Sequence, residues 1–431
     1  MCAVLHGPAP AFAAARAVEG QTMTVTQRLI PNLDELRPGF TDDPYPMLDE
    51  LRARGPAQVH INGMRVWFVT RYRDVRDAFV NPAISNNAAH ASDEAKSWDW
   101  IAANNLGVFP NNIAALDPPD HTRLRRLVGR EFTVQRVERL RPRIEAIVEE
   151  LVGRFRHRGS VELIEEFAAP LAITVIAELF GVPVEQRQPL RQWSDIVAGV
   201  EEGDSARVFE AFGALRALLE DLIEHKRRQP ERGSDLLSGL ITVHEDEDRL
   251  TRDELLSTAW VMLFAGHTTT LDLIGNGTLA LLRNPGQLAA LRADPALLGS
   301  AVEECLRYDG PVNAPAVRFA KEDVRVGEAT IPAGDVILLW LTGANRDPDR
   351  FADAGTMDIL RRDRHLAFGH GIHHCVGAPL ARLEATTAFR ALLSLPDLAL
   401  DAGQPLRWRL SMPLRGLRNL PLTFGTNSDE E

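Results

Sequence analysis

The sequence predicts a mainly α-helical fold with small β-sheets, arranged around one long central helix. Apolar residues recur at three-and-four spacing over several long segments, which is typical of helices that pack on a core. One segment near the middle of the chain is apolar around most of its circumference, as expected of a helix buried on all sides. Strand-like segments are fewer and short.

Four segments show the helical spacing most clearly. They are RLRPRIEAIVEELVGRF, APLAITVIAELFG, FGALRALLEDLIEHKRR and ALLGSAVEECLRY. Each places its apolar residues on one face, so each is predicted to be a helix lying against the protein core.

The longest helix is expected to begin at Thr251 and to continue to about Leu282. The residues TRDE at its start form a capping box, which marks a helix N-terminus. Between Ala259 and Leu282 the only acid is Asp272, and there is no Lys or Arg before Arg283. This helix is therefore predicted to run through the centre of the protein.

The predicted strands are short. AQVHI and RVWFVT lie on either side of INGM and are expected to form a β-hairpin. DVRV, DVILLWL and LRWRLS are expected strands in the C-terminal half.

Residues 81–112 lack clear periodicity but contain Trp98, Trp100 and Phe109. Long segments of this kind are either functional lids or solvated surface loops, and both interpretations remain open at this point.

The composition predicts one large domain. The chain has 431 residues, 45% hydrophobic and 25% charged, and no segment rich in Pro, Gly and Ser divides it. Residues 1–30 are expected to be a loose extension, in which Met23 is an alternative start to Met1, and residues 31–431 a single domain. No internal repeat is seen.

The charge and cysteine content exclude several classes of protein. Acidic residues outnumber basic ones by 60 to 48, and Lys and Arg are scattered, so a nucleic-acid partner is not expected. The sequence contains no window of about 18 uncharged apolar residues, so no membrane segment is expected. The three cysteines are far apart and form no CxxC pair, which favours a reducing, cytoplasmic location.

The segment HLAFGHGIHHCVGAPLARLEATTAFRALL carries a cysteine at the start of a helix. Gly369 and Gly371 permit tight turns, and Pro379 suits the first helical turn. Backbone N–H groups and the helix dipole at that place favour the thiolate form of Cys375. Three interpretations compete: an inert buried cysteine, a haem thiolate ligand, and a zinc site. Zinc would use Cys375 with His370, His373 or His374, but it normally requires four ligands and no second cysteine lies nearby.

The stretch FGHGIHHCVG resembles the haem-ligand signature of the cytochrome P450 family. The matching positions are Phe368, Gly369, Gly371, His373, Cys375 and Gly377. The resemblance covers nearly all of the chain beyond residue 40 and is strongest to actinobacterial enzymes that tailor macrolides and other secondary metabolites. It implies the P450 fold, with the long helix over haem b (iron protoporphyrin IX), and Cys375 as the ligand of the iron. It also implies that Phe368 packs beside that ligand and that Gly377 lets the following helix approach the porphyrin.

Four basic residues match the family's binders of the haem propionates. His121 and Arg125 are four residues apart on a predicted helix after Pro118 and Pro119, so both side chains can reach one anion. The resemblance adds Arg318, in APAVRFA, and His373. Without the cysteine loop, the basic face of the helix would be interpreted as an ordinary solvated surface.

Glu304 and Arg307, in AVEECLRYDGP, resemble the family's ExxR motif. Their spacing of three lets them pair on one helix and brace the segment beneath the haem. Relatives usually add an arginine before the cysteine loop, but this sequence has Thr356 at that position. Arg350 or Arg361 is expected to substitute for it.

The motif AGHTTT, residues 265–270, resembles the family's oxygen-binding groove. Ala265 and Gly266 are expected to leave room beside the iron, and Thr269 takes the position of the threonine that hydrogen-bonds oxygen. Thr268, the second predicted catalytic residue, stands where relatives carry Glu or Asp. Water, His267, Asp272 or a substrate hydroxyl are the alternatives for proton delivery. Threonine on a buried helix can also simply bond to its own backbone.

Electrons are expected from separate proteins. GNGTLA, residues 275–280, fits a dinucleotide fingerprint only formally, because it lies inside a helix and follows no strand. The family resemblance implies a ferredoxin and a ferredoxin reductase as donors. Arg126, Arg130 and Arg382 are candidates to contact an acidic ferredoxin, with solvated surface charge as the alternative.

The resulting hypothesis is a monooxygenase that uses O2 to hydroxylate or epoxidise a bulky apolar metabolite of the macrolide or polyketide kind. Trp98, Trp100, Ala265, the region after Pro311 and Ser411–Pro413 are expected to line its pocket. Two alternatives remain. One is an oxidase that couples rings or closes an ether bridge without inserting oxygen, and the other is a haem-binding sensor or carrier without turnover.

Overall fold

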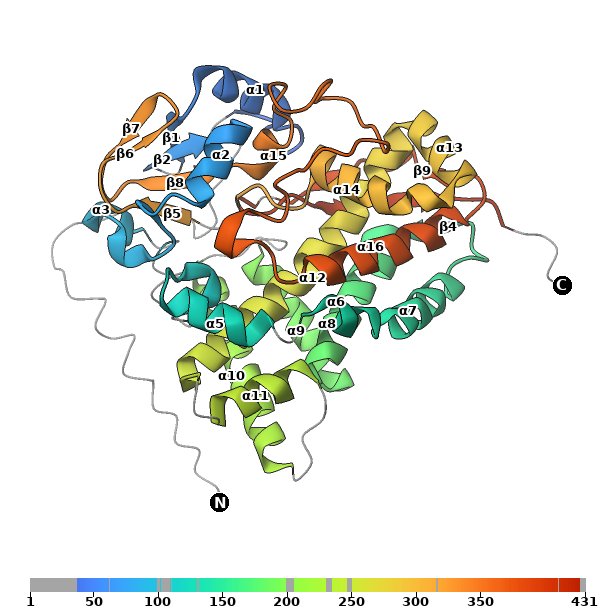
Figure 1. The fold of residues 1–431 in the computed structure, drawn as a ribbon. Helices are drawn as coiled ribbons and strands as arrows, with labels where there is room; N and C mark the ends of the chain where they lie inside the picture. Colours follow the sequence, from blue (N-terminus) through green and yellow to red (C-terminus); the bar gives the residue numbers. More distant parts are fainter. Residues whose placement is uncertain are drawn as a thin grey trace.

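The computed structural model describes residues 37–431, with gaps at 62, 99–100, 102–108, 110, 130–131, 199–204, 230–234, 246–249, 315–316, 410 and 427–431. The expected extension, residues 1–30, and the alternative start at Met23 lie outside the described residues. The fold is mainly helical with small sheets, and the predicted fold class is confirmed (Figure 1).

The α-helices are α1 (Tyr45–Arg54), α2 (Tyr72–Phe79), α3 (Asp93–Lys96), α5 (Asp120–Gly129), α6 (Val134–Glu138), α7 (Arg141–Gly153), α8 (Ala169–Phe180), α9 (Val184–Val197), α10 (Ser205–Arg228), α11 (Leu236–Glu245), α12 (Arg252–Arg283), α13 (Pro285–Ala293), α14 (Leu298–Asp309), α15 (Leu341–Ala344) and α16 (Ala378–Leu393). Short 3₁₀ turns are η3 (Ala88–His90), η4 (Ile113–Ala115), η6 (Pro295–Leu297) and η7 (Gly371–His373), and η5 (Ile164–Ala168) is π-helical. The four segments with clear helical spacing form α7, α8, α10 and α14, as predicted.

The strands are β1 (Ala57–Ile61), β2 (Met64–Val69), β3 (Ile84–Ser85), β4 (Ser160–Glu162), β5 (Val317–Ala320), β6 (Val324–Val326), β7 (Ala329–Ile331), β8 (Val336–Leu339), β9 (Ala399–Leu400), β10 (Arg407–Trp408), β11 (Leu417–Asn419) and β12 (Pro421–Thr423). The largest sheet has the order β1-β2-β8-β5-β3. Its β1–β2 pair is the predicted hairpin, with Ala57 opposite Phe68 and Ile61 opposite Met64. The smaller sheets are β4-β12-β9, β10-β11 and β6-β7.

Helix α12 is the predicted central helix and nearly matches the expected bounds. Thr251 accepts the N–H of Glu254, and the Glu254 carboxylate accepts the N–H of Thr251, which completes the capping box. The helix packs against α8, α14 and α16. At Gly277 the approach is so close that a Cβ atom would lie 2.5 Å from the ring of Phe389 on α16. GNGTLA is therefore a packing segment within this helix.

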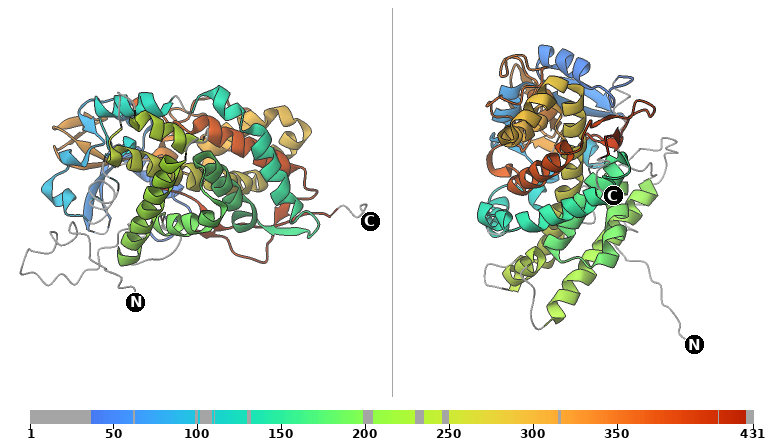
Figure 2. Two further views of the ribbon diagram at one scale, coloured as in Figure 1. Left: turned by 90° about the horizontal axis from the view of Figure 1, so that it is seen from below. Right: turned by 90° about the vertical axis from the view of Figure 1, so that its right-hand side faces the viewer.

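The core is divided between a helical part and a part built on the large sheet. The biggest apolar cluster joins α7–α12 and α16, whereas two others surround β1, β2, β5 and β8. Figures 1 and 2 show this division: the sheet lies at one side of the molecule beside α1 and α2, and α12 runs through the helical part toward α14.

In the part of residues 81–112 that the structure describes, the chain forms β3, η3, α3 and η4. Trp98 is buried in the sheet-side core, and Phe109 stacks on Trp260 of α12 with ring centroids 4.8 Å apart. Trp100 lies outside the described residues. These contacts tie both ends of the segment to the core, and whether it acts as a lid remains a prediction.

Within the described ranges, no single helix is long and apolar enough to cross a membrane. The pair Ile164–Phe180 and Val184–Val197 meets the criterion only jointly and is bent by 119°. The apolar side chains of α8, within this pair, are buried in the helical core.

Candidate active site

The cysteine loop is held in shape by two glycines and by backbone hydrogen bonds. Gly369 and Gly371 have φ angles of +72° and +67°, a conformation that residues with a side chain rarely adopt. The Cys375 N–H donates to the carbonyl oxygen of Phe368 at 2.8 Å, which closes the loop. Helix α16 then begins at Ala378, with a proline in its first turn. The sequence thus places the cysteine immediately before a helix N-terminus, as predicted.

The Cys375 side chain is exposed, but it lies in a recess of the protein. Burial among surrounding atoms raises the pKa of the Cys375 thiol, while the N–H groups of Gly377 and Ala378 and the charges of Arg125 and Arg382 oppose this shift. The expected helix effect on the thiolate is present but is outweighed by burial. A bound metal ion would deprotonate such a thiol.

Two of the alternatives for this cysteine find little support. An inert structural cysteine is buried, as Cys305 is at 1% exposure, whereas Cys375 is exposed. Among the residues that the structure describes, no group of three or more His, Cys, Asp and Glu side chains is arranged to hold a metal ion. The three histidines of the loop therefore provide no zinc ligand set there.

Four basic side chains converge near the cysteine. His121 and Arg125 lie on α5, Arg318 on β5 and His373 in η7, and the rings of His121 and His373 are 4.1 Å apart. Burial, together with the charges of Arg318, His121 and Arg125, lowers the pKa of His373 to about 3. Burial likewise lowers the pKa of Arg318 to about 10, with Asp117 opposing. The sequence-predicted propionate binders are thus neighbours.

This cluster fits a dianionic group such as a pair of carboxylates. His121 is 2% exposed, and its Nδ1 atom has no hydrogen-bond partner among the described residues. The charged groups of the cluster are Arg318, which is 3% exposed, and the half-buried Arg125, and an anion would compensate their charge while the two histidines offer N–H donors. Beside Cys375, a Cβ atom at Gly377 would meet only the cysteine sulfur, at 3.9 Å. The protein therefore leaves space next to the sulfur, and the chemistry of these residues suits a haem with its propionates.

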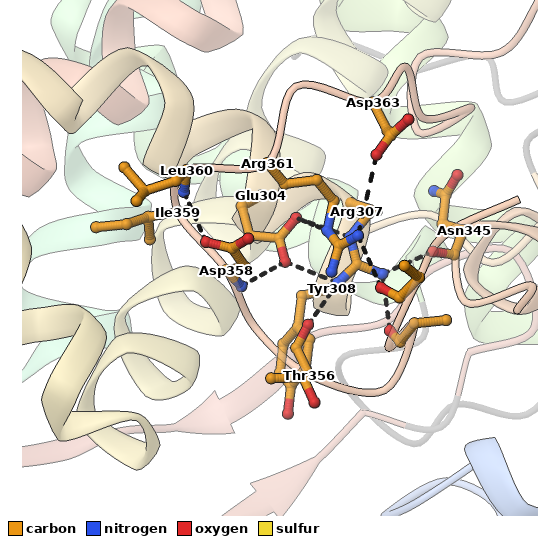
Figure 3. Close-up of polar contacts among 12 residues, drawn as sticks. Glu304, Arg307, Tyr308, Asn345, Thr356, Asp358, Ile359, Leu360, Arg361 and Asp363 are labelled. Carbon is orange, nitrogen blue, oxygen red and sulfur yellow. Dashed lines mark hydrogen bonds and ion pairs between the residues drawn. The ribbon is translucent and has the colours of Figure 1, made fainter.

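Glu304 and Arg307 of α14 form a fully buried ion pair, each with 1% of its side chain exposed. Arg307 Nε and Nη2 donate to the two Glu304 carboxylate oxygens, both at 2.7 Å (Figure 3). Arg307 also donates to the carbonyl oxygens of Asn345, Ala354 and Thr356 at 2.8–2.9 Å. The pair fastens α14 to the segment that leads into the cysteine loop.

Arg361, and not Arg350, occupies the third position of this brace. Arg361 Nε lies 3.5 Å from Glu304 Oε2, and its side chain is 9% exposed (Figure 3). Arg350 instead pairs with Asp363 at 2.7 Å near the surface. Thr356 takes part through its backbone carbonyl. Of the two expected substitutes for the arginine not found at position 356, Arg361 is therefore the one that lies on the Glu304 carboxylate.

On α12, Ala265 is exposed and Thr269 is partly exposed, although almost all of their neighbours on the helix are buried. Both therefore face open space inside the protein. The Thr269 hydroxyl donates to the Ala265 carbonyl at 2.6 Å and keeps its lone pairs as acceptors. Gly266 differs from the expectation, since a Cβ atom there would lie 2.7 Å from Ile176 of α8. Its missing side chain makes room for that helix.

Thr268 is completely buried, and its hydroxyl lies 3.3 Å from His267 Nε2. His267 Nδ1 lies 2.8 Å from the carbonyl of Leu263, which requires a hydrogen on Nδ1 and leaves Nε2 as an acceptor. Burial lowers the pKa of His267 to about 4, so the ring is neutral. The residue at the family's acid position thus donates to a neighbouring imidazole.

Asp272 has a partner that the sequence did not indicate. It forms an ion pair with Arg409, and both side chains are at most 2% exposed. Burial lowers the pKa of Arg409 to about 10. Arg409 lies in the predicted strand LRWRLS, far along the chain, and no local pattern marks it as a partner of α12. Asp272 was a candidate for proton delivery, but its carboxylate is engaged in this structural ion pair.

Some predicted pocket residues lie together. Trp98, Ala314 and Met412 belong to one buried apolar cluster, which brings together the segment around Trp98, the region after Pro311 and the Ser411–Pro413 turn. Along α12, Trp260 stacks on Phe264 at 4.9 Å and meets Phe212 edge-on at 5.7 Å. Trp260 and Phe264 thus provide aromatic surface in the turns of α12 just before the exposed Ala265.

A groove of about 1940 Å³ runs along the outer side of the cysteine loop. Its lining is mixed in charge, with eleven arginines and eight carboxylates. The arginines include several from α2, from the segment before the loop and from α16: Arg73, Arg76, Arg361, Arg362, Arg364 and Arg382. Of the three arginines predicted to contact a ferredoxin, Arg382 lines this groove. Arg126 is exposed on α5, and Arg130 lies outside the described residues.

Comparisons with known proteins agree with this site. The family model described as Cytochrome P450 matches residues 165–407. The chain is 47% identical over 416 residues to Cytochrome P450 monooxygenase PikC of Streptomyces venezuelae, covering 94% of this chain and 96% of that protein. It is 40% identical to 6-deoxyerythronolide B hydroxylase of Saccharopolyspora erythraea, covering 91% and 98%. The solved structure of the tirandamycin C-bound P450 monooxygenase TamI superposes with a TM-score of 0.81 at 40% identity, covering 90% and 98%.

Proposed function

Because the chain belongs to the cytochrome P450 family and is a P450 monooxygenase, we propose that it hydroxylates or epoxidises a bulky, largely apolar secondary metabolite of the macrolide or polyketide kind. The observation that carries the proposal is the cysteine recess. An accessible sulfur at Cys375, a cluster of two arginines and two histidines, and space beside Gly377 occur together. No other described site joins a thiol to such a cluster.

The residues that would hold haem follow from this arrangement. Cys375 would bind the iron, and His121, Arg125, Arg318 and His373 would bind the propionates with charge-assisted hydrogen bonds. Phe368 would support the sulfur from the loop side, where its carbonyl accepts the Cys375 N–H. When bound, haem b supplies the redox chemistry that activates O2.

Thr269 would position a proton beside the reacting centre. Its hydroxyl donates to Ala265, so it can accept a hydrogen bond from water or from substrate. Thr268 and Asp272 do not supply that proton directly, because one donates to His267 and the other pairs with Arg409. Water or a hydroxyl of the substrate itself is then the proton source next to Thr269. Thr268 keeps the neighbouring turn of α12 in place.

Thr269→Ala is expected to raise the hydrogen peroxide released per electron pair several-fold, because the hydroxyl that orients the proton donor is lost. Peroxide and product are measured against the NAD(P)H consumed. Thr270→Ala is the matched control, since Thr270 makes the same type of bond to the carbonyl four residues earlier but is 2% exposed. Equal coupling in wild type and Thr269→Ala would contradict this role.

The substrate class rests on the relatives and on the apolar surroundings of Ala265. One relative is a hydroxylase of 6-deoxyerythronolide B, and the TamI structure contains tirandamycin C. In this chain, Trp260 and Phe264 stack on each other in the turns of α12 that precede Ala265. Such a lining favours bulky ligands with few polar groups.

The arginine-rich groove would receive the electron donor. It lies against the cysteine loop, and Arg73, Arg362 and Arg364 form no ion pair within the described residues. Positive surface of this kind attracts an acidic protein and orients its approach. We assign this face to a ferredoxin, which a ferredoxin reductase would supply with electrons.

The proposed reaction is tested with isotopically labelled oxygen. Monooxygenation places one atom of O2 in the product and releases the other as water, with consumption of two electrons and two protons. Turnover under ¹⁸O2 with a ferredoxin, its reductase and candidate macrolides is therefore expected to give a product heavier by one labelled atom. A dehydrogenated or coupled product without label would instead support an oxidase. The presence of Thr268 in place of Glu or Asp is compatible with that reaction.

A further inference from the structure

One carboxylate, that of Glu303 on α14, holds both arms of the cysteine loop. Downstream of Cys375, Arg382 donates from Nε and Nη2 to the two Glu303 oxygens at 2.6 and 2.8 Å. Upstream, His365 Nδ1 accepts the N–H of Ala367 at 3.1 Å, so its Nε2 carries the hydrogen that points to Glu303 Oε2 at 3.2 Å. The segments before and after the cysteine are thus joined through a third element.

The arginine held in this way lies next to the cysteine's own support. The guanidinium of Arg382 stacks over the Phe368 ring at 4.5 Å, and the Phe368 carbonyl accepts the Cys375 N–H at 2.8 Å. The positive charge of Arg382 is near enough to favour the thiolate of Cys375. Burial opposes ionisation of Glu303, but the hydrogen bonds from Arg382 and His365 lower its pKa to about 2, so it stays ionised.

Glu303 differs from its neighbour Glu304 in what it can influence. Glu304 is buried and pairs with Arg307 inside the protein. Glu303 has 37% of its side chain exposed and lines the arginine-rich groove with Arg382 and His365. Glu303 and Glu304, adjacent on α14, therefore hold the segments around the cysteine loop from two sides. Of the two, Glu303 is the one that pairs with Arg382.

We propose that Glu303 acts on the cysteine ligand through Arg382, because its carboxylate partly neutralises the positive charge that Arg382 holds against Phe368 in the cysteine loop. This rests on the proposed role of Cys375 as the haem ligand. A positive charge near a redox centre favours the gain of an electron, and an adjacent carboxylate reduces that effect. Glu303 would thus set the reduction potential of the haem through Arg382.

The test is a double-mutant cycle on the haem-loaded enzyme, with reduction potential as the measurement. Glu303→Gln is expected to shift the potential in the positive direction, because stacking on Phe368 keeps the guanidinium in place without its counter-charge. Arg382→Gln is expected to shift it in the negative direction. In the Arg382→Gln background, the further change of Glu303 to Gln should have little effect.

Glu328→Gln is the matched control. Glu328 lines the same groove and also pairs with an arginine, Arg71 at 2.7 Å, but its side chain is 71% exposed and does not contact the loop. Its loss should leave the potential unchanged. The proposal would be overturned if Glu303→Gln left the reduction potential unchanged. It would also be overturned if Glu303→Gln shifted the potential equally in the wild-type and in the Arg382→Gln background. Wild-type enzyme without the absorption of a sulfur-ligated haem would overturn the ligand assignment itself, and this proposal with it.

Discussion

Cys375→Ser is expected to abolish the far-red displacement of the Soret band that sulfur ligation gives to the reduced carbon monoxide complex. Serine offers a hydroxyl, which stays protonated near neutral pH and brings no sulfur to the iron. Product formation should fall by at least about 1000-fold, which corresponds to about 4 kcal/mol of transition-state stabilisation. Absorption spectra of the reduced, carbon monoxide-treated protein and product assays measure the two effects.

Cys305→Ala provides the control for this experiment. Cys305 is 1% exposed on α14, and burial raises the pKa of its thiol. Removing this sulfur should leave the absorption band where wild type has it. The assignment of Cys375 would be wrong if Cys375→Ser kept the displaced band or if Cys305→Ala lost it.

The parts of the fold that the sequence predicted best are those with local signals. The N-terminus of α12 is marked by a capping box formed by Thr251 and Glu254, two residues only three apart. The β1–β2 hairpin is marked by two strand segments on either side of a short turn. The cysteine loop is marked by Gly369, Gly371 and the proline after Cys375.

The parts that were missed depend on contacts between distant segments. Asp272 was the only acid in a buried helix, so a partner was required, but nothing in the sequence indicated Arg409. Gly266 was interpreted as making room in a ligand site, and the neighbour that actually needs this room is Ile176 on another helix. Only tertiary packing decides such pairs.

The arginine that joins the buried Glu304–Arg307 pair was only partly predicted from the sequence. The sequence showed that the usual arginine was absent at Thr356 and offered Arg350 and Arg361 as substitutes. Both are charged and both flank the same loop, so periodicity could not separate them. The path of the chain decides, because it buries Arg361 beside Glu304 and leaves Arg350 with Asp363 near the surface.

Arg307→Lys is expected to destabilise the protein by several kcal/mol, because each buried carbonyl oxygen that loses its donor costs about 1–3 kcal/mol. Lysine keeps the charge but has one nitrogen in place of the planar fork. It cannot serve Glu304 and the carbonyl groups of Asn345, Ala354 and Thr356 at once. The free energy of unfolding from urea denaturation measures the loss, and haem retention should fall with it because the brace adjoins the cysteine loop.

Arg350→Lys makes the same chemical change in an exposed pair. Arg350 and Asp363 lie 2.7 Å apart, with 34% and 41% of their side chains exposed, so water replaces most of what is lost. A surface pair of this kind contributes at most about 1 kcal/mol. The stability difference between the two lysine variants therefore isolates the effect of burial. Equal losses would mean that the Glu304–Arg307 pair does not brace the loop, since an arginine outside the brace would then matter as much as one inside it.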